Sequence, residues 1–355
     1  MPGHYKTIAP RAGALHSPGA AAIARPHQAE TVGVALTAAI LAVRAGEPVV
    51  AVVQAAPRAG AESLPCGPFR PSEHRTLEGG VASWVRAQTG VEIAFLQQLC
   101  TLAETDGGSD SDAPEGADDP RHSVPPTLSV GYLALVGPSQ CSDRTPASWR
   151  TWYTFLPWED WRYGRPDCLT GIVERLEAWA GRPRPPCASA PEEDAEDRRQ
   201  RVRLAFGTAG AGWDDEKVLE RYELLQEAGL IGAGATDGLA ARLPRLEHSL
   251  LGDHGALLAR AIGELRRAVK HRPVVFELMP DAFTLFELQR TVEAILGPHL
   301  HKQNFRRLVE SGGLVEPTGE HRLRTGGRPA RLYRFRSDVL WERVAPGVRV
   351  KAGRA

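Results

Sequence analysis

Apolar residues along the first third of this chain repeat with a spacing of about two, then about 3.6, then two again. The β-prone runs at 32–43 and 48–54 are separated by a short turn and predict a hairpin. Residues 77–88 place their apolar side chains on one face of a helix, which a glycine ends. Strand-like spacing returns at 91–102 and 128–136. This region therefore predicts a sheet with at least one packed helix.

The middle of the chain predicts helices. Residues 169–180, 214–229 and 255–271 have amphipathic helical spacing. The helix at 214–229 begins with acidic residues and ends at a glycine, as helix capping favours. Residues 182–197 are rich in proline and then in acidic residues, which is typical of a linker.

The last fifth of the chain predicts a winged helix-turn-helix. Thr284 and Glu287 form a T-x-x-E capping box that opens a helix at 285–296. A Gly-Pro pair ends that helix, and a second helix follows at about 299–311. Two short strands then enclose a glycine-rich tip. This order of elements is typical of a fold that places its second helix in the major groove of DNA.

The charge distribution supports that interpretation. The chain has 43 Lys and Arg and 43 Asp and Glu, yet residues 299–336 hold nine basic and three acidic residues, a local charge of +6. Arg, Lys, Asn and Gln side chains read base edges, and wing cations hold phosphates. The alternative is a winged helix that docks protein. The residues predicted to bind DNA are Thr284, Lys302, Gln303, Asn304, Arg306, Arg307, Arg322, Arg324, Arg328 and Arg331.

Length and composition bound the remaining possibilities. A chain of 355 residues exceeds one ordinary core, so two or three domains are expected. Its five cysteines include no CxxC pair, which favours a reducing cytoplasm over a zinc site or a disulfide framework. The longest apolar run is too short to cross a bilayer, and residues 1–27 lack a signal-peptide pattern. We therefore expect a cytoplasmic protein without a membrane partner.

Several motifs together resemble a known family. The C-terminal string LHKQNFRRLVE, with GYLALV, WYTFLPWEDWRYGRP, VLERYELLQEAGL and RPVVFELMP, is similar to Nudix-related transcriptional regulators of NAD metabolism, the NrtR-like group. The similarity is greatest to their longer, alphaproteobacterial type, and it covers most of residues 28–343. The resemblance implies a degenerate Nudix α/β/α sandwich with a mixed sheet, a helical linker region and the C-terminal winged helix.

The Nudix box itself, G-x5-E-x7-R-E-U-x-E-E-x-G-U, has lost its acidic positions. With Gly90 as the anchor, the glutamate positions fall on Arg75, Trp84, Ala87 and Gln88. Nudix hydrolysis needs carboxylates that hold divalent cations against a pyrophosphate. Glu73 and Glu78 remain nearby but out of register. We therefore expect no catalytic residue, no metal site and no required cofactor, so that this domain binds its nucleotide without cutting it.

A ligand pocket without metal would use other groups. Arginines suit a pyrophosphate, and tryptophans stack on planar rings. The resemblance implies an effector among NAD, ADP-ribose and ATP. The alternative is a vestigial pocket in a domain that only dimerises. Adjacent Glu159 and Asp160 are expected to point apart, so they are not an acid/base pair. The residues predicted to bind the ligand are Arg70, Arg75, Arg86, Arg121, Trp149 and Trp158.

These expectations combine into one hypothesis and two alternatives. The predicted divisions are a flexible tail at 1–27, a ligand-binding domain at 28–166 with a disordered loop at 104–126, a helical insert at 167–272 and the winged helix at 273–345. We expect a ligand-responsive repressor of NAD biosynthesis or salvage genes that binds a palindromic operator as a homodimer. One alternative is an active Nudix-type pyrophosphatase with a nucleic-acid-binding C-terminal domain. The other is a protein-docking scaffold.

Overall fold

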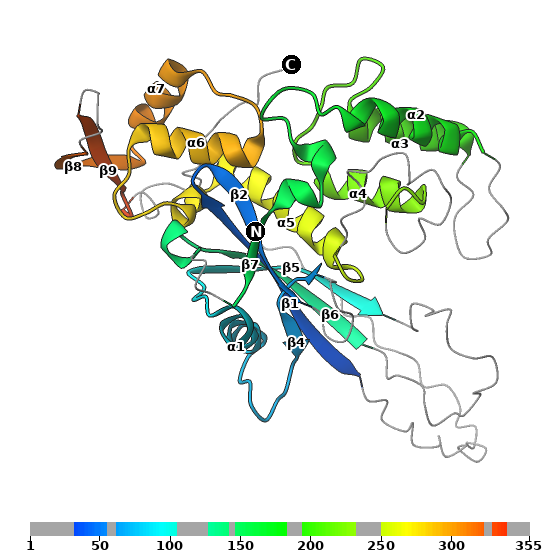
Figure 1. Cartoon of the computed structure of the whole chain (residues 1–355), viewed down its shortest axis with the longest axis horizontal. Helices are drawn as coiled ribbons and strands as arrows, with labels where there is room; N and C mark the ends of the chain where they lie inside the picture. The colour runs from blue at the N-terminus through cyan, green and yellow to red at the C-terminus, as the bar shows by residue number, and fades with distance from the viewer. Residues whose placement is uncertain are drawn as a thin grey trace, which may run out of the picture.

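A mixed β-sheet separates two layers of core in the first half of the molecule (Figure 1). The computed structural model describes residues 32–54, 62–104, 127–141, 146–182, 194–231, 250–322 and 329–338. Neighbouring strands follow the order β3-β2-β1-β6-β5, with β4 paired to β1 and β7 to β2. Among the strand pairs that the structure describes in this sheet, β1–β6 is parallel and the others are antiparallel. The strands are β1 (Gly33–Arg44), β2 (Glu47–Gln54), β3 (Glu62–Ser63), β4 (Cys66–Pro68), β5 (Phe95–Glu104), β6 (Thr127–Leu135) and β7 (Ser148–Thr151).

The hairpin predicted from the two apolar runs is confirmed. Strands β1 and β2 pair antiparallel up to Arg44 and Glu47, and the two turn residues between them have φ values of 52° and 83°. Positive φ at both central positions matches the right-handed twist of a hairpin. Alternate residues of β1 point into opposite core layers, because strand side chains alternate.

Helix α1 (Leu77–Thr89) covers one face of the sheet. Thr76 caps its start by accepting a hydrogen bond from Gly79, and Gly90 ends it in the left-handed conformation. Val81 and Val85 are fully buried against the sheet. The opposite face is covered mainly by α5 (His254–His271), whose apolar stripe contacts β1 and β6. The sheet therefore lies between helical layers, as expected for an α/β/α sandwich.

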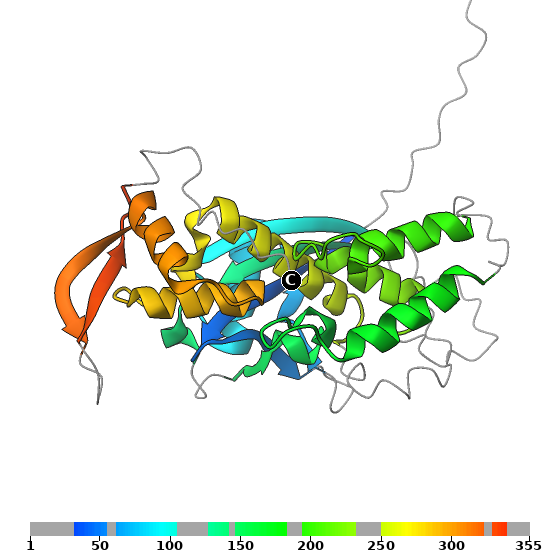
Figure 2. The same ribbon diagram turned by 90° about the horizontal axis from the view of Figure 1, so that it is seen from above.

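Helices α2 (Cys168–Ala180), α3 (Ala195–Phe206) and α4 (Val218–Glu227) lie beyond α5 (Figures 1 and 2). Helix α4 packs on α5, while α2 and α3 pack on one another at the end away from the winged helix. One continuous apolar cluster includes residues of the sheet, of α2 to α6 and of the winged helix. The described part of 167–272 is therefore built into this core, and the predicted domain boundaries stay predictions.

The C-terminal elements have the predicted order. They are the 3₁₀ segment η6 (Pro273–Leu278), α6 (Leu285–Leu296), α7 (Lys302–Gly312), β8 (Val315–Arg322) and β9 (Ala330–Phe335). The capping box of Thr284 and Glu287 is confirmed, with both reciprocal hydrogen bonds present. Phe283 and Tyr333 form a β-bridge that ties the chain before α6 to β9. Figure 2 shows the β8–β9 hairpin projecting beyond α7.

Three short 3₁₀ segments complete the sheet half: η1 (Pro138–Gln140), η2 (Trp152–Thr154) and η3 (Pro157–Glu159). Among the helices that the structure describes, none is long and apolar enough to cross a membrane.

Candidate functional site

Helix α7 presents a polar face away from the core. Phe305 and Val309 are buried and hold the helix against the rest of the winged helix. The opposite face exposes Lys302, Gln303 and Arg307, along with Asn304 and Arg306. Within the described residues, Lys302, Gln303, Asn304 and Arg307 make no side-chain hydrogen bond or ion pair. These four side chains are therefore available to a ligand.

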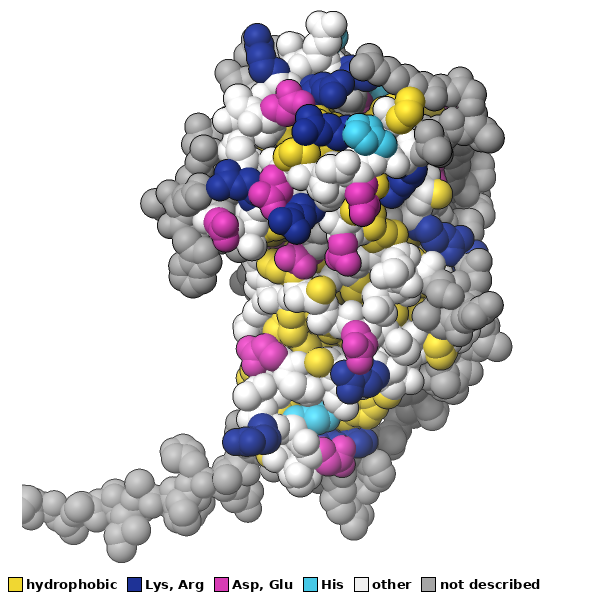
Figure 3. Space-filling view, turned by 90° about the vertical axis from the view of Figure 1, so that its left-hand side faces the viewer, with side chains coloured by type: hydrophobic (Ala, Val, Ile, Leu, Met, Phe, Trp, Pro, Cys, Tyr) yellow, Lys and Arg dark blue, Asp and Glu magenta, His cyan; other side chains and the backbone are white. Residues whose placement is uncertain are grey.

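Several cations at this end are already paired with glutamates. Arg306 lies 3.5 Å from Glu310, and Arg334 bonds to Glu316 across the wing at 2.6 Å. Arg322 pairs with Glu287 at the start of α6. Figure 3, which faces this end, accordingly shows Lys and Arg side chains interspersed with Asp and Glu. The local positive charge is therefore less available than a count of basic residues indicates.

A groove of about 1110 Å³ lies between α6, α7 and the wing. Half of the residues predicted to bind DNA line it: Thr284, Lys302, Arg306, Arg322 and Arg331. The exposed ring of Phe286, missed from the sequence, lies there too. Gln303, Asn304 and Arg307 lie on α7 outside the lining, and Arg324 and Arg328 lie outside the described residues.

In the sheet half, two positions that a Nudix box reserves for glutamate are packed against β4. The Nε1 of Trp84 donates to the carbonyl of Pro68 at 2.9 Å, and its ring lies so close to Gly67 that a Cβ there would be 2.3 Å from Cε2. The amide of Gln88 is bonded to both backbone polar groups of Cys66. Neither side chain supplies the anionic oxygen that Mg²⁺ prefers. The residues at these positions do not fit a divalent-metal site.

The predicted phosphate-binding arginines do not form one cluster. Arg70 pairs with Glu73 at 3.2 Å and lies over the Trp84 ring at 5.2 Å. Arg86 is in the last turn of α1 and pairs with Glu92 at 3.3 Å, whereas Arg75 precedes the first turn. About 16 Å of helix separates Arg75 from Arg86. Arg121 lies outside the described residues.

The two predicted tryptophans have different environments. Trp158 is 1% exposed and belongs to the central apolar cluster, so the prediction that it stacks on a ligand is wrong. Trp158 fills the core together with its apolar neighbours. The spacing of tryptophans in the sequence does not distinguish a core side chain from one that stacks on a ligand. Trp149 is only partly buried, on β7, and stays a candidate.

Several buried polar atoms without hydrogen-bond partners in the described part of the chain lie on the face of the sheet that α1 covers. Among the described residues, Tyr132 Oη, Trp149 Nε1 and Thr151 Oγ1 are buried without a hydrogen-bond partner. Strand alternation places all three on the face covered by α1. Burial, with a smaller contribution from Glu78, raises the pKa of Tyr132, so its hydroxyl stays a donor. The sequence analysis missed Tyr132 and Thr151, although the strand alternation within GYLALV and SWRT could have placed their side chains on this face.

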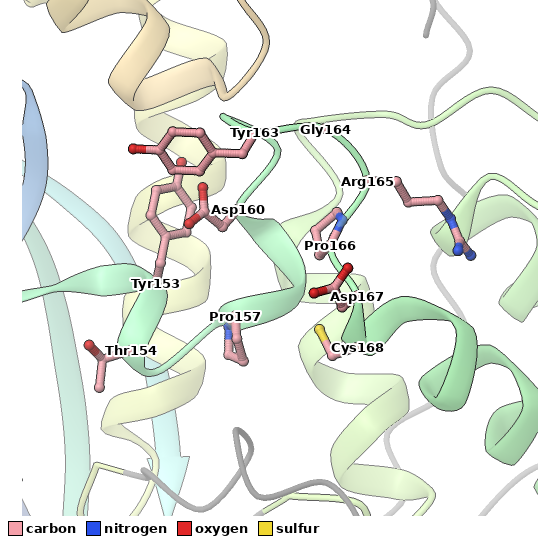
Figure 4. A pocket seen from close by; sticks show the side chains of 10 residues that line it. All are labelled: Tyr153, Thr154, Pro157, Asp160, Tyr163, Gly164, Arg165, Pro166, Asp167 and Cys168. Atoms are coloured by element: carbon pink, nitrogen blue, oxygen red, sulfur yellow. The ribbon is translucent and has the colours of Figure 1, made fainter.

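The aromatic motif WYTFLPWEDW, residues 152–161, forms the junction between the sheet and the winged helix. Tyr153 Oη donates to the carbonyl of Ala294 near the end of α6 at 3.0 Å. A cavity of about 520 Å³ lies beside it (Figure 4), with Tyr153 and Asp160 on one side and Asp167 and Cys168 on the other. The guanidinium of Arg162 lies over the Tyr153 ring at 4.7 Å and bonds to Asp160 at 2.8 Å.

Beneath this motif is a fully buried ion network. Glu159 receives hydrogen bonds from Arg221 of α4 and from Arg266 of α5, and all three side chains are 0% exposed. Arg266 also donates to the carbonyl of Ile295 in α6 at 2.9 Å. Burial alone would lower the pKa of Arg266, but Glu159 outweighs it and keeps the charge. Glu159 is bonded to Arg221 and Arg266 in the core, whereas the adjacent Asp160 is bonded to Arg162 beside the cavity, so the two carboxylates have different partners.

Comparison with known proteins identifies the C-terminal module. Residues 275–335 match the NrtR DNA-binding winged helix domain. The chain is 42% identical over 90 residues to the ADPR responsive transcriptional repressor NtrR of Acinetobacter baylyi, a match that covers 25% of this chain and 36% of that protein. The chain thus spans about a third of the length of this curated relative.

Solved structures with similar folds were also found. NrtR of Shewanella oneidensis in complex with a 27mer DNA is 19% identical, with a TM-score of 0.49 over 86% of this chain and 94% of that chain. The NUDIX domain of the same protein in complex with ADP ribose is 20% identical, with a TM-score of 0.28 over 38% and 83%. The sequence match places residues 275–335 in the NrtR DNA-binding winged helix domain family.

Proposed function

We propose that this protein is a ligand-responsive transcriptional repressor that binds double-stranded operator DNA through α7 and the wing. One observation carries the proposal: a winged helix of the NrtR DNA-binding type exposes Lys302, Gln303, Asn304 and Arg307 without intramolecular partners in the described chain. Arg and Lys suit guanine and phosphate, and Asn and Gln suit adenine. A helix so equipped can both bind and discriminate DNA sequences.

The proposed effector is ADP-ribose, with NAD and ATP as related candidates. The Acinetobacter baylyi relative is named ADPR responsive, and a NUDIX domain of Shewanella oneidensis NrtR has been solved with ADP ribose. In this chain, the partly buried Trp149 and Thr151 carry polar side-chain atoms without a hydrogen-bond partner among the described residues, which a nucleotide can satisfy. NAD biosynthesis or salvage genes are the proposed targets.

We propose that the ligand binds without being cut and without a required cofactor. Trp84 and Gln88 occupy carboxylate positions of the Nudix box and are committed to β4. Binding without hydrolysis suits a sensor, because a protein that does not consume its ligand leaves the concentration that it senses unchanged. Hydrolysis of ADP-ribose with Mg²⁺ by the purified chain would instead support the pyrophosphatase alternative.

Communication between the two ends has a structural basis in α6. This helix packs on both β2 and α5, and Tyr153 and Arg266 hold the carbonyls near its end. An effector changes DNA affinity only if it binds the DNA-competent and incompetent states unequally. We propose that the sheet half biases the position of α6, and that the protein acts as a homodimer in the cytoplasm, where operator DNA is present.

The test is a fluorescence-anisotropy titration of labelled duplexes from the protein's own promoter and neighbouring promoters. Lys302→Ala and Arg307→Ala should each weaken binding. The matched control Arg199→Ala, an exposed arginine on α3 at the end of the molecule away from the winged helix, should not. Unchanged binding by both α7 variants would favour the protein-docking scaffold. Repeating the titration with ADP-ribose, NAD and ATP identifies the effector and its direction.

A further inference from the structure

The wing, which is the β8–β9 hairpin, is joined to α6 by an ion pair. We propose that the ion pair between Glu287 and Arg322 straps the wing against the start of α6, so that Arg322 is a positioning residue and not a phosphate contact. This inference rests on the proposed DNA binding. It replaces the sequence-based prediction that Arg322 touches DNA directly.

Both oxygens of Glu287 are committed. Oε2 accepts hydrogen bonds from the Thr284 backbone N–H at 2.8 Å and from its hydroxyl at 3.1 Å, which closes the capping box. Oε1 accepts from Nη1 of Arg322, the last described residue of β8. One carboxylate thus joins the first turn of α6 to the wing.

Arg322 is anchored at a second point. Its Nη2 donates to the carbonyl of Ala282 at 3.3 Å. Next to it, Phe283 and Tyr333 exchange both backbone hydrogen bonds, at 2.9 and 2.8 Å. The guanidinium therefore spans from β8 to the segment that leads into α6. These contacts fix the angle of the wing where the groove between α6, α7 and the wing is formed.

Removing the charge of Glu287 should have opposite effects on DNA affinity, depending on whether Arg322 contacts a phosphate or positions the wing. Glu287 is about one-third exposed at the rim of that groove, where a phosphate backbone would lie. If Arg322 turned to a phosphate, the carboxylate would remain unpaired beside the DNA and repel it. Removing the carboxylate would then free a cation and tighten binding. If Arg322 is a strap, the same change loosens the wing and weakens binding.

The discriminating variant is Glu287→Gln. Glutamine at this position still supports a capping box, so α6 should begin where it does now. Salt dependence supplies the second readout, because each phosphate contact adds about −0.9 to the slope of log K against log salt concentration. The matched control is Glu316→Gln, which removes a wing carboxylate paired with Arg334 but leaves α6 untouched.

The experiment titrates the full-length chain and its variants against a labelled promoter duplex over a series of salt concentrations. We expect Glu287→Gln and Arg322→Gln each to weaken binding about two- to fivefold, as suits a partly exposed ion pair. The salt slope of both variants should equal that of the wild type. Thermal unfolding by circular dichroism checks that every variant is folded.

Tighter binding by Glu287→Gln, or a slope for Arg322→Gln smaller by about 0.9, would overturn the strap and restore Arg322 as a phosphate contact. An equal weakening by Glu316→Gln would also overturn it, because that pair does not reach α6. A wild-type chain that binds no duplex would refute the proposed function itself, which is a separate outcome.

Discussion

The side-chain amide of Gln88 is bonded to both backbone polar groups of Cys66: Oε1 accepts from the N–H at 3.0 Å, and Nε2 donates to the carbonyl at 2.7 Å. This pair of bonds ties the last turns of α1 to β4. Both bonds are possible because a glutamine amide accepts through its oxygen and donates through its nitrogen at the same time. A glutamate, which a hydrolase would have here, cannot donate to that carbonyl.

Gln88→Glu should therefore destabilise the protein without creating a metal site. The carboxylate loses the donated bond and places its charge against the carbonyl of Cys66, at a cost of about 1–3 kcal/mol. Urea unfolding measures the change, with the exposed Gln98→Glu as the matched control. Stabilisation of the variant by added Mg²⁺ would show that carboxylates at this face suffice to bind metal.

Gly67→Ala tests the packing of Trp84. A Cβ at residue 67 would lie 2.3 Å from the indole, so the ring must move, and we expect a loss of about 1–3 kcal/mol. Gly212→Ala, where a Cβ meets nothing within 4 Å, is the control. In a Trp84→Ala background the same substitution should cost much less. Equal costs in both backgrounds would mean that the indole does not lie over residue 67.

Glu159→Gln should be among the most damaging single changes. It leaves the buried guanidinium groups of Arg221 and Arg266 without their carboxylate, and breaking a buried pair costs about 3–5 kcal/mol. Chemical unfolding at neutral pH measures the loss. Glu223→Gln, on the exposed face of α4, should change stability by less than about 0.5 kcal/mol. A mild effect at Glu159 would contradict the buried network.

The pH dependence of stability tests the contact between α5 and the start of α4. Burial lowers the pKa of Lys270, but hydrogen bonds to Asp215 and Glu216 outweigh burial and raise it above 10.5. A raised pKa means that the stabilisation is complete below 10.5 and is lost as pH rises through the folded-state value. Lys270→Met should therefore cost about 1–3 kcal/mol at pH 7 to 9. The difference from wild type should shrink only above pH 10.5; shrinkage between pH 7 and 9 would contradict this.

The parts of the fold governed by local rules were predictable from the sequence. The β1–β2 hairpin, α1 with its glycine end and the capping box of α6 depend on residues within a few positions of each other. Element boundaries were less predictable. The helix expected from 214 begins at Val218, because Asp214 bonds to the N–H of Glu216 and forms a turn there. The strand expected from 91 begins at Phe95.

Contacts between distant residues were not predictable. The partners of Glu159 lie 62 and 107 positions away, and nothing in the spacing marked Arg221 or Arg266 as buried. The same limit applies to the candidate site. The sequence indicated which side of α7 is polar, but only the fold shows that Arg322 faces Glu287 and that Trp158 is in the core.

The central claim is that the protein binds DNA and senses a nucleotide that it does not cut. The most direct measurement follows anisotropy of a labelled promoter duplex with the full chain during titration with ADP-ribose in EDTA, and then analyses the nucleotide by chromatography. We expect a complex that forms without metal, a shift in its affinity on adding ADP-ribose, and intact ADP-ribose at the end, even when Mg²⁺ is supplied. Absence of a complex, or conversion of ADP-ribose to AMP and ribose phosphate once Mg²⁺ is present, would contradict the claim.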